Sequence, residues 1–318
     1  MTSRRSRVLL ILPLVGCVWL AGCVKQVRSS VPAFAQAAEL TSTNVQAAFQ
    51  TVNDTYTQAE TIHFVVTYDG TVDPGKIPTG WLPQDSVDVR MQILQGLKQY
   101  ASELSSLTGS NDIDSLNKAS TAMGMSLKDL AKTPQFSALA KKVPSNISDQ
   151  AATAVDTLGN WLIELKLKKE LPALIEKMDP NIQTLCALLS EDIGSLDPNS
   201  LEGSGLRQVL WIQYNRIILA QNQWILHNTC GAKDAPANCF SPEVRLAEIQ
   251  KLPTLVRQRN TSDQTLQQVK VTLKQLAQAN TELVKAAQTN QDMNADIGDL
   301  LAESQRLYTY YNSLSSGK

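Results

Sequence analysis

Along much of the chain, apolar residues recur at alternating intervals of four and three positions, the pattern of a helix that packs lengthwise against other helices. The first such segment runs from about Val31 to Tyr68, and Asp69-Gly70 then predicts its end, since glycine suits the left-handed residue after a helix. The stretch 63–72 also permits a small Asp-Gly hairpin, but we favour the helix because the apolar seam continues into this stretch as far as Val66. The seam residues are Val45, Phe49, Val52, Tyr56, Ala59, His63 and Val66.

The same spacing predicts two long helices and a short one in the next part of the chain. Asp85 caps a helix, and a second long helix follows "TGSN". A short helix is expected between Pro134 and Pro144. The seams of the two long helices contain Val89, Ile93, Leu97, Tyr100, Leu104 and Leu107, and then Ile113, Leu116, Ser120, Met123, Leu127 and Leu130.

Proline and glycine divide the middle of the chain. A helix from about Ser148 is expected to kink or restart at Pro172, and Asp179-Pro180 predicts a new start, with Asp as the cap and Pro at the first helical position. Gly203-Ser204-Gly205 reads as a flexible corner between helices. The helix from about Leu206 to Asn228 is the most apolar and is therefore predicted to be the most buried.

The C-terminal part predicts the longest helix. Ser241-Pro242-Glu243 opens a helix that Pro253 disturbs, and an uninterrupted seam then runs from about Ser262 to Asn312, or roughly 75 Å. The centre of this seam is polar, with asparagine at 280, 290 and 294, and a seam asparagine fixes the register and permits a bend. The fold class is therefore predicted to be all-α: an elongated, mostly antiparallel helical bundle with long coiled-coil-like helices, spanning residues 31–318.

Composition supports helices over sheets and argues against a nucleic-acid partner. Aromatic residues make up only 5% of the chain, whereas strands are rich in aromatic and β-branched residues. The N-terminus begins with Arg4, Arg5 and Arg7, followed by an apolar run from Val8 to Ala21 that is too short to span a bilayer. Removing residues 1–22 takes away these three arginines and no acidic residue, which leaves 26 basic against 30 acidic residues and no basic surplus.

The end of the apolar run reads Leu20-Ala21-Gly22-Cys23. This resembles the lipobox of bacterial lipoproteins, and the resemblance covers residues 1–23 only. It implies cleavage before Cys23 and acylation of that residue, so that residues 1–22 are a removed signal peptide and residues 23–30 a lipidated, short tether. Two or three acyl chains anchor a protein stably in a membrane. Val24 rather than Asp follows the cysteine, which by the usual sorting pattern implies the outer membrane, facing the periplasm.

Three cysteines remain in the mature chain besides Cys23. Cys230 and Cys239 lie close together in a loop rich in Gly, Pro and Asn, and in an exported protein this predicts a local disulfide. A metal site is the alternative, but two cysteines without a nearby pair of histidines provide too few ligands. Cys186 lies in the apolar run "IQTLCALL" and is expected to be a buried, inert thiol.

Motifs that carry chemistry are scarce. Glu60 and His63 share one helix face in the Glu-x-x-His spacing of carboxylate-bridged di-metal bundles, but no second copy of the motif exists, so they form only a weak metal candidate. Residues 70–76 match G-x-x-x-x-G-K, but Ile77 and Pro78 follow where a phosphate loop needs Ser or Thr and a helix start. We therefore expect no cofactor and no catalytic residues.

The sequence thus favours a lipid-anchored binding or scaffold module of the cell envelope. An envelope protein is a possible partner, and the C-terminal tyrosines Tyr308, Tyr310 and Tyr311 are candidate contact residues, although packing against the bundle is the stronger expectation for them. One alternative is a helical pore-forming protein. Segment 209–226 comes nearest to a membrane span, but its Gln, Asn and Arg residues make it a poor one. The other alternative is an envelope enzyme without a recognisable motif.

Overall fold

The computed structural model describes residues 16–68, 70, 80–108, 113–164, 171–200, 202–231, 236, 239–289 and 291–316, and side chains from Ser30 onward except at 108, 113–117 and 316. All regular structure in these residues is helical apart from two isolated bridges, so the predicted all-α class is confirmed. The helices are α1 (Gly16–Thr67), α2 (Gln84–Thr108), α3 (Ile113–Leu130), α4 (Pro134–Ala140), α5 (Ser145–Glu164), α6 (Leu171–Ile193), α7 (Gly205–His227), α8 (Pro242–Thr289) and α9 (Asn294–Ser316).

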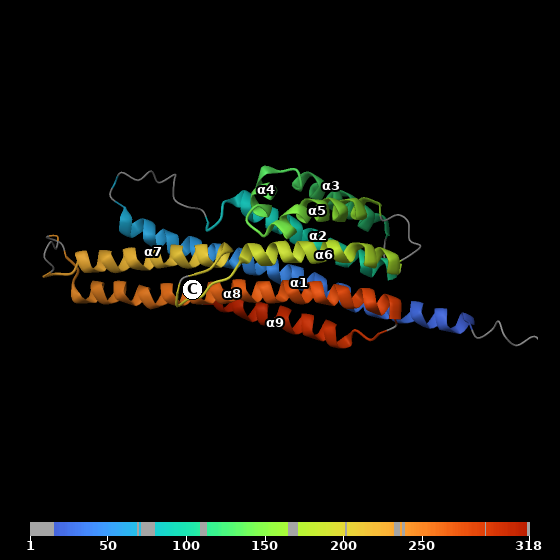
Figure 1. Cartoon of the computed structure of the whole chain (residues 1–318). Helices are drawn as coiled ribbons and strands as arrows, with labels where there is room; N and C mark the ends of the chain where they lie inside the picture. Colours follow the sequence, from blue (N-terminus) through green and yellow to red (C-terminus); the bar gives the residue numbers. More distant parts are fainter. Residues whose placement is uncertain are drawn as a thin grey trace, which may run out of the picture.

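Helices α1 and α8 form the centre of an elongated bundle (Figure 1). Helix α1 packs against α2, α7, α8 and α9, while α8 packs against α6, α7 and α9. The predicted seam of α1 is buried from Val45 to Ala59 and is partly exposed only at its last two members, His63 and Val66. The seam spacing therefore identified the core-facing side of this helix correctly. The backbone remains helical to Thr67, so the hairpin alternative fails at its first five residues.

The bundle places the start of α1 and the α7–α8 connection at opposite ends (Figure 1). Helix α1 is continuous through residues 23–30, which the sequence analysis assigned to a tether. The 44 residues between Cys23 and Thr67 correspond to roughly 66 Å of helix. The end of the bundle that carries the α7–α8 connection is therefore far from the predicted acylation site.

Helices α3 and α5 cross at two glycines. A β-carbon on Gly124 would lie 2.5 Å from the carbonyl oxygen of Gly159, and one on Gly159 would lie 2.7 Å from that of Gly124. Any larger side chain would force the two backbones apart. Neither glycine belongs to the apolar seams, so the periodicity alone did not indicate this crossing.

The start predicted at Asp179-Pro180 is wrong. Pro180 lies inside α6, which begins at Leu171, next to the kink or restart that was also predicted at Pro172. The Asp179 side chain does not cap a helix but accepts hydrogen bonds from Asn280 Nδ2 (2.8 Å) and Thr281 Oγ1 (3.1 Å) on α8. This carboxylate therefore fixes the alignment of α6 against α8.

The prediction for the C-terminal helices is wrong in its boundaries and correct for one of the three seam asparagines, Asn280, since Asn294 is exposed and position 290 lies outside the described residues. Helix α8 runs from Pro242 through Pro253 to Thr289, and the chain restarts as α9 at Asn294, so the segment from Ser262 to Asn312 is two helices. Asn280 is fully buried and also accepts a hydrogen bond from Tyr100 Oη at 3.0 Å. A buried polar residue with partners on two other helices specifies the register of the bundle.

Candidate binding surface

The end of the bundle opposite the start of α1 is formed largely by α7 and the first part of α8, together called the distal hairpin (residues 205–261). The two helices are antiparallel and are joined by specific polar contacts. Arg207 forms a two-pronged ion pair with Asp263, with nitrogen–oxygen distances of 2.8 and 2.9 Å. The Arg259 guanidinium lies 4.0 Å from the ring centre of Trp211, and Gln221 Nε2 donates to Glu248 at 3.0 Å.

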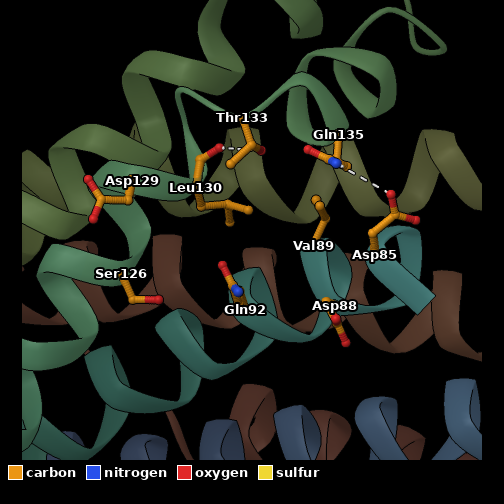
Figure 2. Close-up of a pocket in the computed structure, with 9 residues that line it drawn as sticks. All are labelled: Asp85, Asp88, Val89, Gln92, Ser126, Asp129, Leu130, Thr133 and Gln135. Atoms are coloured by element: carbon orange, nitrogen blue, oxygen red, sulfur yellow. Dashed lines mark hydrogen bonds between the residues drawn. The ribbon is translucent and has the colours of Figure 1, made fainter. Parts of the chain in front are cut away.

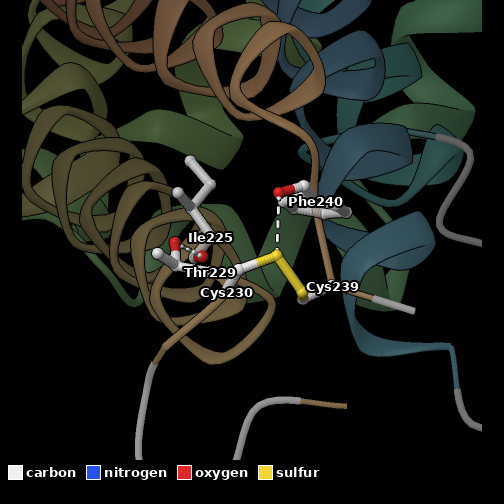
Figure 3. Close-up of a disulfide and its surroundings, with 5 residues drawn as sticks. All are labelled: Ile225, Thr229, Cys230, Cys239 and Phe240. Atoms are coloured by element: carbon white, nitrogen blue, oxygen red, sulfur yellow. Dashed lines mark hydrogen bonds between the residues drawn. A yellow bond between two sulfur atoms is a disulfide. The ribbon is translucent and has the colours of Figure 1, made fainter. Parts of the chain in front are cut away.

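A disulfide closes the tip of the distal hairpin, as the sequence predicts (Figure 3). Cys230 and Cys239 are joined with their Cα atoms 5.1 Å apart. Beside them, Phe240 N donates to the Asn228 carbonyl at 2.7 Å, and the Phe240 ring packs edge-on against Trp224 at a centroid distance of 4.8 Å. The disulfide bond therefore fixes the point where the chain turns from α7 into α8.

The distal hairpin exposes a set of large apolar side chains, here called the outer face. Their relative exposure ranges from 43% at Ile249 to 60% at Leu226. Most large apolar side chains elsewhere in the bundle are buried, and contiguous exposed apolar surface on a soluble protein marks a site of interaction. The outer face comprises Ile212, Leu219, Leu226, Leu246 and Ile249.

The two helices present these residues on the same side. On α7, Ile212, Leu219 and Leu226 repeat every seven residues and lie about a quarter turn beyond the positions that contact α8. On α8, Ile249 lies about a quarter turn beyond Glu248, which contacts α7, and Leu246 lies about 60° further round in the same sense. Because antiparallel helices turn in opposite senses when viewed from one end, equal rotations bring both sets to one side, away from α1.

The inner side of the same hairpin is unusually polar. Gln221 is fully buried, and its Oε1 has no hydrogen-bond partner in the described part of the chain. Arg207, Ser262 and Asp263 are also buried there. The prediction that the helix from about Leu206 to Asn228 is the most buried is therefore wrong: α7 is apolar on nearly all sides, and its polar residues occupy part of the interior while leucines face outward.

The weak metal candidate is used in a structural contact instead. Glu60 is buried, accepts a hydrogen bond from Tyr56 Oη at 2.5 Å and forms an ion pair with Arg216 of α7 at 3.2 Å. Across the described residues no group of three or more His, Cys, Asp or Glu side chains could hold a metal ion. Burial, together with Glu60, raises the pKa of the Tyr56 hydroxyl. This cluster therefore joins α1 to the middle of α7.

His63 gives the protein a predicted pH dependence. Burial lowers its pKa below the usual 6.5, and Arg216 acts in the same direction while Glu60 opposes the change. The unfolded chain therefore binds a proton more readily, so the free energy of unfolding should fall as the pH drops below 6.5. We expect His63→Gln to show a smaller decrease than the wild type between pH 7.5 and 5.5 in urea unfolding. His227→Gln controls for the loss of a histidine as such, and equal decreases in the two variants would contradict the assignment.

The C-terminal tyrosines divide between the two expectations. Tyr311 packs partly against the core, and its hydroxyl donates to Asn44 Oδ1 at 3.2 Å. Tyr308 and Tyr310 remain exposed on α9, with the Tyr308 ring against that of Tyr311 at 5.4 Å. Of these three tyrosines, Tyr308 and Tyr310 are therefore the ones available for contact with a partner.

Two other features of the bundle have chemically active groups without the arrangement of a catalytic site. Cys186 is buried on α6, where burial raises the pKa of its thiol to about 12, as expected for an inert cysteine. A groove between α2, α3 and the start of α4 is lined by the carboxylates of Asp85, Asp88 and Asp129 (Figure 2). Gln135 donates to Asp85 across it at 3.4 Å.

The G-x-x-x-x-G-K segment lies outside the described residues except for Gly70, and no side chain is described at Cys23. In the described part of the chain, no helix combines the length and the apolar composition needed to cross a membrane. Comparisons with protein-family models, with curated proteins and with solved structures found no significant match.

Proposed function

We propose that this chain is a lipoprotein of the bacterial envelope that is anchored through Cys23 and acts as a binding or scaffold module. The observation that carries the proposal is the sequence Leu20-Ala21-Gly22-Cys23, placed at the end of a basic and then apolar export signal. Val24 favours the outer membrane, facing the periplasm. The disulfide at the far end of the bundle is in keeping with an oxidising compartment.

Binding rather than catalysis is favoured by how the bundle uses its charged residues. Arg90, Arg207 and Glu60 are buried, and each joins two helices through an ion pair. The exposed features are instead surfaces for contact: the outer face of the distal hairpin, and Tyr308 and Tyr310 on α9. These surfaces suit a protein that holds other envelope components in place.

Replacement of the predicted acylation site tests the anchor. We expect Cys23→Ser to abolish incorporation of labelled palmitate and to move the protein from the membrane fraction to the soluble fraction. Cys17→Ser is the matched control, because it removes a cysteine from the same signal without touching the acylation site, and it should be labelled like the wild type. Equal labelling of the Cys23→Ser protein, or no labelling of the wild type, would contradict the proposal.

Crosslinking in cells tests the scaffold role separately. A photoreactive residue at position 310 should capture a specific envelope protein, whereas one at the exposed Met125 on α3 should not. If position 310 captured only the abundant lipoproteins that position 125 also captures, the tyrosines would have no role in partner binding.

A further inference from the structure

The outer face of the distal hairpin is a two-helix apolar surface that the rest of the described chain leaves uncovered. Leu219 and Leu226 are more than half exposed, while Gln221 between them is fully buried. A helix with one apolar side and one polar side lies stably in the interface of a bilayer, with the apolar side facing the lipid. Helix α7 is apolar on its buried side as well, but the side that its own bundle leaves exposed carries leucines that could meet lipid in the same way.

The pattern of α7 does not favour a second helix as the occupant. A coiled-coil seam needs apolar residues at two positions of each heptad. Ile212, Leu219 and Leu226 supply one of them, but Arg216 and Gln223 occupy the other in the distal half of the helix. The apolar surface is therefore a flat face shared by two helices and not a seam into which another helix would interlock.

Charge distinguishes the distal hairpin from the rest of the protein. Residues 205–261 contain seven Lys and Arg against three Asp and Glu, and with Asp263, the buried partner of Arg207, the net charge is +3, which leaves −4 for the remainder of a chain whose total is −1. The surplus disfavours a second copy, since two such hairpins would repel each other, and it attracts an anionic surface.

Two of these basic residues are placed at the outer face itself. Arg245 and Arg257 lie four residues before and eight residues after Ile249, so they flank it on its side of α8. Neither forms an ion pair with another described residue, whereas Arg216 pairs with Glu60 and Lys251 with Glu248. Arginine beside exposed leucine can hold its charge at lipid headgroups while its stem and the leucine contact acyl chains.

We propose that the outer face docks on an anionic phospholipid bilayer, and that this bilayer is the membrane that holds the Cys23 anchor. The choice of membrane rests on the proposed function, whereas the docking itself does not. An anchor on the same molecule keeps the outer face within roughly 66 Å of its own membrane, which gives that membrane a high effective concentration. Since the outer face runs along the side of the bundle, docking lays the bundle along the bilayer.

Flotation with lipid vesicles tests the docking without the anchor. The probe is the chain from residue 23 with Cys23→Ser, which keeps every residue of the proposed mature protein and removes only the acylation site. We expect it to float with vesicles of equal parts phosphatidylglycerol and phosphatidylcholine and not with phosphatidylcholine alone. Leu219→Gln with Leu226→Gln should weaken binding by about tenfold or more, and Arg245→Gln with Arg257→Gln by about ten- to thirty-fold.

Matched exposed residues provide the control. Met125→Gln on α3 and Leu301→Gln on α9 replace apolar side chains that are 56% and 40% exposed but lie outside the outer face, and they should bind as the wild type does. Circular dichroism of every variant checks that the helices are retained. Equal weakening by the control variants would overturn the assignment of docking to the outer face.

The remaining outcomes also decide the proposal. No flotation of the folded protein with anionic vesicles would overturn it, whether or not Cys23 is acylated. A dimer that the leucine variants dissociate, without vesicle binding, would assign the outer face to a second copy instead. Acylated protein in anionic vesicles should leave them dispersed, and clustering of these vesicles would overturn the placement on the anchoring membrane.

Discussion

Arg90→Met is expected to lower the free energy of unfolding by about 3–5 kcal/mol, because it leaves the carboxylate of Asp192 buried without its partner. Arg90 on α2 and Asp192 on α6 are each about 2% exposed, and two nitrogen–oxygen contacts of 2.7 Å join them. The guanidinium also donates to the Ser86 carbonyl. The loss is a large part of the stability of a typical domain, so urea unfolding followed by circular dichroism should detect it readily.

Two further variants separate a buried charge from a lost contact. Arg90→Met combined with Asp192→Leu removes both charges and should recover most of the stability, because neither group is then left unpaired. Lys98→Met on the same helix breaks an exposed pair with Glu39, whose atoms are 3.6 Å apart, and should change stability by less than about 1 kcal/mol. A double variant as unstable as the single one would show that shape, and not the unpaired charge, causes the loss.

This ion pair illustrates what the sequence alone could not predict. The seam spacing placed Val89 and Ile93 toward the core, and both are buried. Arg90 lies beside that seam, and nothing in the nearby sequence indicates its burial, since its partner is 102 positions away. Periodicity reports which side of a helix is buried, but not which helix covers it. Charged residues at the edges of a seam therefore acquire their roles only when the helices are assembled.

In the distal hairpin the sequence predicted burial where the structure shows exposed side chains. Its apolar content predicted burial, but an average over α7 does not say on which side its leucines lie. The signal was present in the seven-residue repeat of Ile212, Leu219 and Leu226, which runs beside a second repeat at Leu210 and Ile217. Two parallel apolar repeats on one helix indicate two covered sides. Here the bundle covers one of them, at Leu210 and Ile217, and leaves the other exposed.

The disulfide and the Glu60 cluster together explain how such a hairpin stays ordered. The tip carries few buried apolar residues: none of the first 13 residues of α8, from Pro242 to Thr254, is buried. The covalent bond between Cys230 and Cys239 restricts the tip, and the contacts of Glu60 with Tyr56 and Arg216 hold the middle of α7 against α1. An apolar outer face can then be presented at a fixed position, because its support does not depend on burying its own leucines.

The corner between α6 and α7 is closed by backbone hydrogen bonds, whereas Gly203-Ser204-Gly205 had predicted a flexible corner. Gly194 adopts a left-handed conformation at φ +77°, which ends α6. The loop then closes on itself, with Ser204 N donating to the Ser195 carbonyl and Asp197 N to the Glu202 carbonyl, both at 2.8 Å. Glycine is needed here because the two halves of the loop approach each other closely. A glycine-rich loop of this kind has the same sequence pattern as a flexible linker.

Gly194→Ala is accordingly expected to lower the free energy of unfolding by about 3 kcal/mol or more. An added β-carbon would lie 2.0 Å from the carbonyl oxygen of Ser204, and alanine also disfavours the left-handed conformation. Gly231→Ala is the matched control, since its φ is +87° but nothing lies within 4 Å of the added carbon, so it should cost only about 1–2 kcal/mol. Equal losses in urea unfolding would mean that the conformational preference alone accounts for the effect. A clearly larger loss in Gly194→Ala would instead show that close packing of the corner, two residues from Asp192, holds α6 and α7 in line and keeps the buried ion pair with Arg90 aligned.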